Sequence, residues 1–206
     1  AEGLTLDQAA MVEFLAIGAH AVARATVQPG QKVLVVGAGP IGMAVAIFAR
    51  LDGAELTFLD ARADRLAFAA KHLGASHTVQ LGEADHEALS DITGGDFFDV
   101  VFDATGNSKA MERGFGFVGH GGAYVLVSIV ASDITFSDPE FHKRETSLLG
   151  SRNATVADFE RVMEAMRVGE VPEALVTHRM TLSEVPERFA ALTDPAAGVV
   201  KAMIEV

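Results

Sequence analysis

The hydrophobic positions of the chain follow two patterns that alternate along most of its length. Short, continuous apolar runs rich in valine, such as residues 32–37, predict strands that are covered on both faces. The next segment has Ile41, Val45 and Phe48 on one helical face, and Gly53 marks the end of that predicted helix. Further strands are predicted at residues 54–60, 76–80, 97–106 and 121–129. Strands that alternate with helices through short connections predict the α/β class, with a doubly wound parallel sheet.

Both ends of the chain carry helix-start signals. Thr5 and Gln8 have the spacing of a capping box, which predicts a helix through about residue 23. Thr155 and Asp158 repeat this spacing before a second amphipathic helix. A strand, a helix and a final strand are predicted at residues 174–182, 184–192 and 199–206. We therefore expect one module, residues 1–206, in which the sheet covers about residues 17–152 and the segments 1–16 and 153–206 flank it.

The composition narrows the range of partners. The formal net charge is −12 and the 16 lysines and arginines are scattered, which argues against a nucleic-acid partner. No stretch reaches the roughly 18 uninterrupted apolar residues of a membrane span, so we expect no membrane insertion. Without cysteine the chain has neither disulfides nor thiolate metal sites. Because the amino end shows neither a basic leader nor an initiator Met, we expect a segment of a longer protein, with the cytoplasm as its default location.

A glycine turn follows the first predicted strand. Gly37, Gly39 and Gly42 form a G-x-G-x-x-G pattern, with Pro40 and Ile41 inside it. In a dinucleotide site the first glycine permits the tight turn, the second lets a pyrophosphate approach the backbone, and the third lets the helix pack closely on the strand. The same pattern also occurs where a helix merely packs on a sheet. The preceding strand, the following helix and an acidic residue about 20 positions later favour a Rossmann-type dinucleotide site.

Asp60 is that acidic residue, and it ends the second predicted strand. A carboxylate at this position accepts hydrogen bonds from the ribose hydroxyls and repels the 2′-phosphate of NADP, so the sequence predicts NAD as the cofactor. Arg65 leaves alternatives open: it holds the ribose from the other side, serves a 2′-phosphate, or is an exposed helix arginine. With Asp60 present, we favour the first of these.

The chain shows no complete catalytic or metal site. None of its seven histidines forms a ligand pair at helical spacing, and neither a nucleophile elbow nor a Walker A motif is present. The glycines within residues 114–122 predict a turn. Glu13 stands on an otherwise small and apolar helix, where a carboxylate must face water, a metal or a partner. We therefore predict no catalytic residue in this segment, which supplies only the cofactor site that hydride transfer needs.

Six stretches are spread over the whole chain in a specific order and at specific spacing. They are VEFLAIGAHAV, GQKVLVVGAGPIG, LDARADRLAFAAKHLGA, FDVVFDATGN, GGAYVLVSI and LLGSRNAT. In this order they resemble the cofactor half of the medium-chain dehydrogenase/reductase family, which includes the zinc-containing alcohol and polyol dehydrogenases. AIGAHAV and GSRNAT are most similar to the branch that oxidises sugar alcohols and sugar acids, such as sorbitol, idonate and galactitol-phosphate dehydrogenases.

The resemblance implies a GroES-like catalytic domain, absent from this chain, that carries most zinc ligands and the proton relay. By fold analogy it places Glu13 at a third zinc-site position, bound directly or through water. Phe14 stands where many members have proline, which weakens this assignment, and the alternative is an exposed helix glutamate. His20 is expected to be a packed residue rather than a metal ligand.

The resemblance also assigns cofactor contacts to residues after the later strands. It places Ala104, Thr105 and Gly106 at the adenosine and pyrophosphate side, Val127, Ser128 and Ile129 at the nicotinamide, and Ser151, Arg152 and Asn153 at its carboxamide. Lys201 is either a basic residue near the pyrophosphate or an ordinary one at the end of a strand.

The implied activity is zinc-assisted hydride transfer from a polyol, sugar acid or secondary alcohol to NAD, with zinc as Lewis acid. This segment alone is predicted to bind NAD but to be inactive. A homodimer or tetramer would pair the edge strand at Ser147–Ser151. Two alternatives remain. One is a zinc-independent quinone or enoyl reductase that uses NADPH, which Asp60 and Glu13 disfavour. The other is a non-enzymatic dinucleotide-sensing module, which gives no reason for AIGAHAV or GSRNAT.

Overall fold

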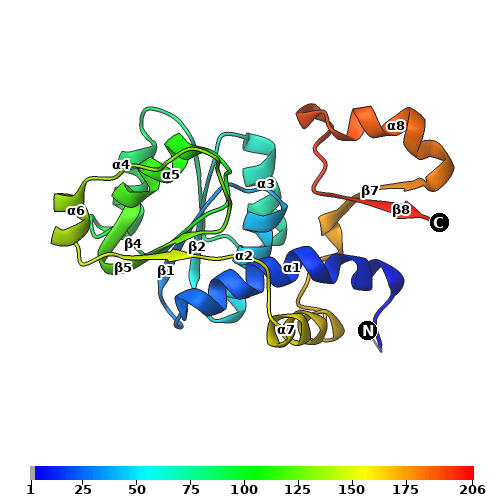
Figure 1. Ribbon diagram of the computed structural model, residues 1–206, viewed down its shortest axis with the longest axis horizontal. Coiled ribbons are helices and arrows are strands. Elements are labelled where there is room, and N and C mark those ends of the chain that lie inside the picture. The colour runs from blue at the N-terminus through cyan, green and yellow to red at the C-terminus, as the bar shows by residue number, and fades with distance from the viewer. Residues whose placement is uncertain (1–2) are drawn as a thin grey trace.

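The computed structural model describes residues 3–206, and a sheet of six parallel strands lies at its centre (Figure 1). The strands are β1 (Lys32–Val36), β2 (Glu55–Asp60), β3 (His77–Gln80), β4 (Phe98–Asp103), β5 (Val118–Leu126) and β6 (Ser147–Gly150). Their order in the sheet is β3-β2-β1-β4-β5-β6. The strand order reverses between β1 and β4, so the carboxyl ends of these two strands border a crevice. The predicted doubly wound, Rossmann-type sheet is confirmed.

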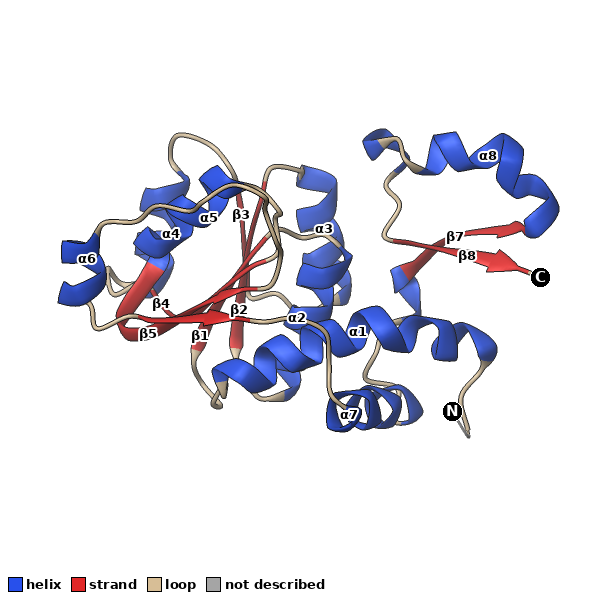
Figure 2. Cartoon of the chain, viewed as in Figure 1, coloured by secondary structure: helices blue, strands red, loops and turns tan. Residues whose placement is uncertain are grey.

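Helices cover both faces of this sheet (Figure 2). They are α2 (Pro40–Leu51), α3 (Ala63–His72), α4 (Asp85–Thr93) and α5 (Ser108–Gly114), whereas the short α6 (Asp138–Lys143) lies at the margin and has no buried residue. In β1, Val33 and Val35 join a hydrophobic cluster that includes residues of α2, whereas Leu34 and Val36 join a second cluster that includes Tyr124. Successive side chains of a strand point to opposite faces, so the continuous apolar run of β1 is explained by cover on both sides.

Two further helices, α1 (Leu6–Ala25) and α7 (Val156–Arg167), begin at the predicted capping boxes. α1 packs across α2 at Gly18, where a Cβ atom would lie 2.5 Å from the carbonyl carbon of Ala44. By length and composition alone, α1 is the one helix in residues 3–206 that is long and apolar enough to cross a membrane. Half of this helix is buried within the fold, where it contacts α2 and α7.

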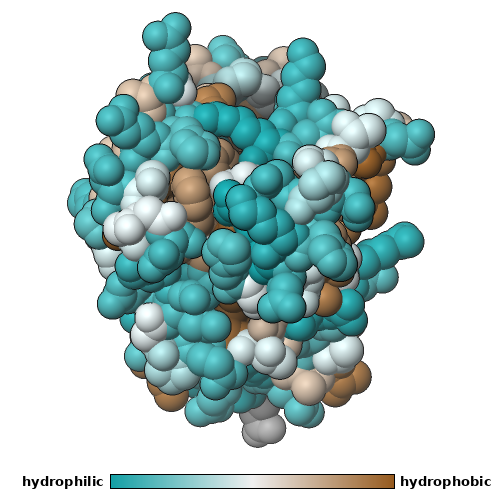
Figure 3. Space-filling model, turned by 90° about the vertical axis from the view of Figure 1, so that its left-hand side faces the viewer, coloured by the Kyte–Doolittle hydropathy of each residue, from teal (hydrophilic) through white to brown (hydrophobic). Residues whose placement is uncertain are grey.

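The carboxyl-terminal segment forms a separate parallel pair of strands. β7 (Val176–Thr181) pairs with β8 (Lys201–Glu205), and α8 (Val185–Leu192) connects them. Figure 1 shows this unit above the amino-terminal half of α1, apart from the six-stranded sheet. α8 has no buried residue, and Phe189 is 57% exposed. On the opposite side of the molecule, near α6, the surface is mostly hydrophilic with small separate hydrophobic patches (Figure 3).

The glycine-rich stretch at residues 114–122 differs from its prediction as a turn, because its second half belongs to β5. Gly119 and Gly122 let this strand pass close to the backbone of Asp96 and Asp99. A Cβ atom at Gly119 would lie 2.7 Å from the carbonyl oxygen of Asp96. Gly121 adopts a left-handed φ of +71°, and the pairing of β4 with β5 shifts register beside this stretch. The glycines therefore allow an irregular strand to continue where the sequence pattern suggested an end.

Candidate cofactor-binding site

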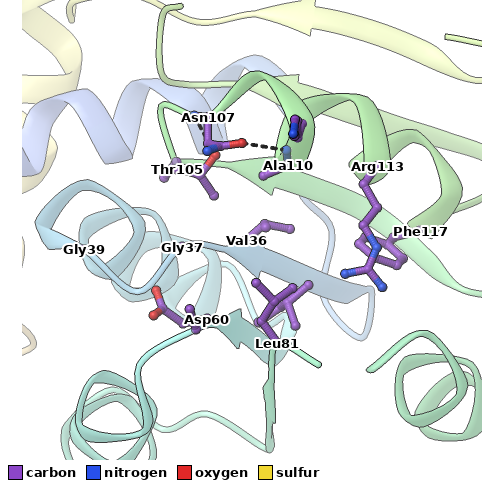
Figure 4. A pocket seen from close by; sticks show the side chains of 14 residues that line it. Val36, Gly37, Gly39, Asp60, Leu81, Thr105, Asn107, Ala110, Arg113 and Phe117 are labelled. Carbon is purple, nitrogen blue, oxygen red and sulfur yellow. Dashed lines mark hydrogen bonds between the residues drawn. The ribbon is translucent and has the colours of Figure 1, made fainter. Parts of the chain in front are cut away.

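A cavity of about 560 Å³ opens at the carboxyl ends of β1, β2 and β4. This is the crevice beside the reversal of strand order, the usual place for a ligand in an open parallel sheet. Its volume falls within the range of small-molecule sites. Figure 4 shows the glycine turn at one end of the cavity and Arg113 at the other, with Asp60 and Leu81 along the wall between them.

The glycine turn is closely packed on one side and open on the other. Gly37 has a φ of +97°, and its N–H donates to the carbonyl of Leu59 at 2.8 Å. At Gly42 a Cβ atom would lie 1.9 Å from the carbonyl oxygen of Gly37. At Gly39, which lines the cavity, a Cβ atom would meet nothing within 4 Å. α2 begins at Pro40 without a side-chain cap, so its amino end is left open at the turn, and an open helix amino end favours anions.

Asp60 links the turn to the end of β2. One carboxylate oxygen accepts the N–H of Ala38 at 2.6 Å, and the other accepts the N–H of Arg62 at 2.7 Å. Each carboxylate oxygen can accept more than one hydrogen bond, so both retain capacity for a ligand. Because Asp60 also lines the cavity, it is oriented to accept hydrogen bonds from hydroxyl groups inside it.

Asp103 is fully buried at the end of β4 and organises the next loop. Its Oδ1 accepts the N–H of Thr105 at 3.0 Å, the hydroxyl of Thr105 at 2.9 Å and the hydroxyl of Ser128 at 3.3 Å. The Ser128 hydroxyl in turn accepts the N–H of Gly106 at 2.9 Å. Burial raises the pKa of Asp103, and the hydrogen bonds from Thr105 and Ser128 oppose this shift. Its Oδ2 is buried without a hydrogen-bond partner among residues 3–206.

A second cavity, of about 330 Å³, lies on the other side of this network. It brings together Ser128, Ile129, Ser151 and Arg152, four of the residues assigned to the nicotinamide side. The hydroxyl of Ser151 is buried, and within the described part of the chain it has no hydrogen-bond partner. Val127 is buried, and Ala104 and Thr105 line the first cavity. The structure thus gathers these predicted residues into two adjoining sites joined through Asp103.

Arg65, Lys201 and Asn153 are predicted residues that line neither cavity. The guanidinium of Arg65 donates to the carbonyl of Val199, and burial, followed by neighbouring charge, lowers the pKa of Arg65. The amino group of Lys201 lies 4.8 Å from the ring centre of Phe14. Asn153 is exposed, with a left-handed φ of +59°.

Glu13 is exposed on α1, and residues 3–206 contain no group of three or more His, Asp or Glu side chains able to hold a metal. These residues do not fit a complete zinc site by themselves. His20 packs between helices: its Nδ1 lies 2.8 Å from a carboxylate oxygen of Asp158 on α7. Burial raises the pKa of Asp158, but hydrogen bonds from Thr155 and His20 hold it below its ordinary value.

The far end of the first cavity was not predicted from the sequence. Its walls there include Leu81, Asn107, Lys109, Ala110, Arg113 and Phe117. Asn107 also caps α5, since its side chain accepts the N–H of Ala110 at 3.1 Å. The helical spacing of Lys109 and Arg113 was the available signal, because residues four apart lie on one face of a helix.

This chain is similar to known dehydrogenases. A family model described as zinc-binding dehydrogenase matches residues 40–167. The chain is 42% identical over 192 residues to L-galactonate-5-dehydrogenase of Escherichia coli (strain K12), covering 91% of this chain and 56% of that protein. It is 31% identical over 194 residues to a sorbitol dehydrogenase of Halalkalibacterium halodurans, covering 92% and 57% of the two chains.

Among solved structures, 2R,3R-butanediol dehydrogenase from Bacillus subtilis matches with a TM-score of 0.90 at 26% identity. That match covers 100% of this chain and 59% of the other. The chain therefore spans just over half the length of the relatives that it matches.

Proposed function

Because the chain belongs to the zinc-binding dehydrogenase family and corresponds to its cofactor-binding domain, we propose that it binds NAD across the two cavities beside β4. The pyrophosphate lies over Gly39, against the uncapped amino end of α2, which favours negative charge. The adenosine occupies the larger cavity, and the nicotinamide the smaller one beside Ser128 and Ser151.

The carboxylate of Asp60 carries this proposal. It is fixed by two backbone N–H groups, lines the larger cavity and keeps free acceptor capacity for ribose hydroxyls. A 2′-phosphate at the same position would bring two negative charges together, which costs several kcal/mol where neither can move away. We therefore assign NAD, and not NADP, as the preferred cofactor.

The whole protein is proposed to transfer hydride from a polyol, sugar acid or secondary alcohol to this NAD. The two curated relatives support the substrate class, since they are a galactonate and a sorbitol dehydrogenase. In this division of labour, residues 1–206 hold and orient the hydride acceptor, and the segments 1–16 and 153–206 join a catalytic domain outside the chain. Glu13 is proposed to supply one ligand, directly or through water, to a zinc site that this domain completes.

β6 supports a proposed assembly. It is an edge strand of the sheet, and Leu148 on it is 41% exposed. Two chains that pair along Ser147–Ser151 would satisfy the open backbone groups of both edges. Sedimentation analysis should give a dimer or tetramer, and a monomer at all concentrations would contradict this assembly.

Calorimetric titration with NADH and NADPH tests the cofactor assignment. We expect NADH to bind at least about tenfold more tightly than NADPH, and Asp60→Asn to narrow this ratio because the repelling charge is removed. Tighter binding of NADPH by the unchanged chain would favour the reductase alternative. The chain alone should show no alcohol oxidation, and robust turnover would contradict the proposed division of labour.

A further inference from the structure

The far wall of the larger cavity contains a fixed guanidinium group. Arg113 on α5 reaches across to Asp85 at the start of α4, and each terminal nitrogen of Arg113 contacts one carboxylate oxygen of Asp85. One of these contacts measures 2.6 Å. The side chain of Asp85 is fully buried, and it also accepts the N–H of Gly82 at 3.2 Å. A bidentate pair of this kind fixes both the position and the plane of the guanidinium.

An aromatic ring supports the same group. The guanidinium carbon of Arg113 lies 5.3 Å from the ring centre of Phe117, within the range of a cation–π contact. The Arg113 side chain is nevertheless 39% exposed, and both residues line the cavity. Figure 4 shows the Arg113 side chain at the end of the cavity, beside the Phe117 ring. Arg113 is therefore held on one side by Asp85 and Phe117 and is open to a ligand on the other.

The charge of this wall decides what it can recognise. Asp85 neutralises Arg113, so the pair presents little net charge to an anion. A guanidinium plane stacks well on flat aromatic groups even when its charge is paired. The exposed Lys109, one turn earlier on α5, also lines this wall, but the paired guanidinium of Arg113 itself is better suited to a neutral aromatic base than to a phosphate.

The order of groups along the cavity identifies that base. The glycine turn, Asp60 and Arg113 follow one another across it (Figure 4). Pyrophosphate, ribose and adenine follow one another in the same order in a dinucleotide. We propose that Arg113 is an adenine-binding residue, whose guanidinium plane contacts the adenine ring of the bound cofactor. This inference rests on the proposed NAD site and adds a specificity-determining contact to it.

Arg113→Lys is the decisive substitution, because lysine can still pair with the buried Asp85 but has no plane for an aromatic ring. Arg113→Ala removes the pair as well and can destabilise the fold by leaving Asp85 unpartnered. The matched control is Arg188→Lys, since Arg188 also forms an ion pair, with Glu184, but lies on α8. Circular dichroism and thermal unfolding of each variant establish that the chain is folded.

The probes are NADH, ADP-ribose, which keeps the adenosine and pyrophosphate, and reduced nicotinamide mononucleotide, which lacks adenosine. We expect Arg113→Lys to weaken ADP-ribose and NADH binding about fivefold to tenfold, to leave the mononucleotide unchanged, and Arg188→Lys to match the original chain. Unchanged ADP-ribose affinity in Arg113→Lys would overturn the adenine assignment alone. An equal loss for the mononucleotide would overturn it as well, because the effect would then not depend on adenine. If the original chain binds neither NADH nor ADP-ribose, the proposed NAD site itself fails.

Discussion

A single methyl group at Gly42 is expected to disrupt the glycine turn. In Gly42→Ala the new Cβ atom would lie 1.9 Å from the carbonyl oxygen of Gly37 and 3.2 Å from Cγ1 of Val35. Ordinary contact begins at 3.4 Å, so the turn and the first turn of α2 must separate by roughly 1.5 Å. The nearest obstructing atom belongs to the backbone, which cannot rotate away as a side chain can.

The expected cost follows from this geometry. Overpacking a well-packed site usually costs about 1–3 kcal/mol, and a backbone obstruction belongs at the upper end of that range. In a chain of 206 residues, a loss of about 3 kcal/mol lowers the melting temperature by about 6–12 °C. Thermal unfolding followed by circular dichroism measures this shift directly.

Gly39→Ala is the matched control, because the same methyl group there meets nothing within 4 Å and the φ of −78° suits alanine. We expect its melting temperature to stay within about 2 °C of the original, while NADH binding weakens at least about tenfold because the methyl group occupies space proposed for the pyrophosphate. The two glycines therefore separate packing from binding. A Gly42→Ala chain that melts with the original, or equal destabilisation by both substitutions, would refute this reasoning.

Two predictions concern pH. The hydrogen bond from Arg113 lowers the pKa of Asp85 in the folded chain. Asp85 therefore stabilises the fold fully above its pKa in the unfolded chain, about 3.9, and this stabilisation is lost as the pH falls through the lower pKa of the folded chain. Acid unfolding should be steeper in the original chain than in Asp85→Asn. Tyr124 is the only tyrosine of the chain, and its pKa is raised by burial first and by the charge of Asp103 second. Its contribution to stability is therefore complete below its pKa in the unfolded chain, about 10, and is lost as the pH rises. Absorbance at an alkaline pH should therefore show tyrosinate only as the chain unfolds, and reversible ionisation of the folded chain would contradict this.

The parts of the fold that follow from local patterns were predictable from the sequence. β1 is apolar from Val33 to Val36 because both faces are covered there, and the capping box at Thr5 marks the start of α1. The start of β5 was not predictable, because the glycines around Gly121 favour a turn unless a neighbouring strand supplies hydrogen bonds. α6 has only six residues and none of them is buried, so it lacks the apolar stripe on which a prediction depends.

Some residues of the candidate site follow from a local sequence pattern, and others are brought together only by the folded chain. Gly37 and Asp60 were predictable because they lie at a fixed separation within one strand–helix–strand unit. Arg65 lies at a position that suggests a contact with the ribose. Its hydrogen-bond partner is instead the carbonyl of Val199, 134 positions later, and only the folded chain brings the two together. Arg113 and Asp85 lie 28 positions apart on different helices, so their ion pair leaves no local pattern.

The hydrogen bonds of the buried Asp103 connect residues of the two cavities, and no local sequence pattern predicts them. In the sequence it is only the last residue of a buried strand. In the structure one of its oxygens accepts hydrogen bonds from Thr105, which lines the larger cavity, and from Ser128, which lines the smaller cavity. A carboxylate buried at this depth is costly unless hydrogen bonds compensate it, and here those bonds are the ones that fix the two cavities relative to each other. In the proposed complex with NAD, Asp103 would therefore position residues at both ends of the cofactor although it lines neither cavity itself.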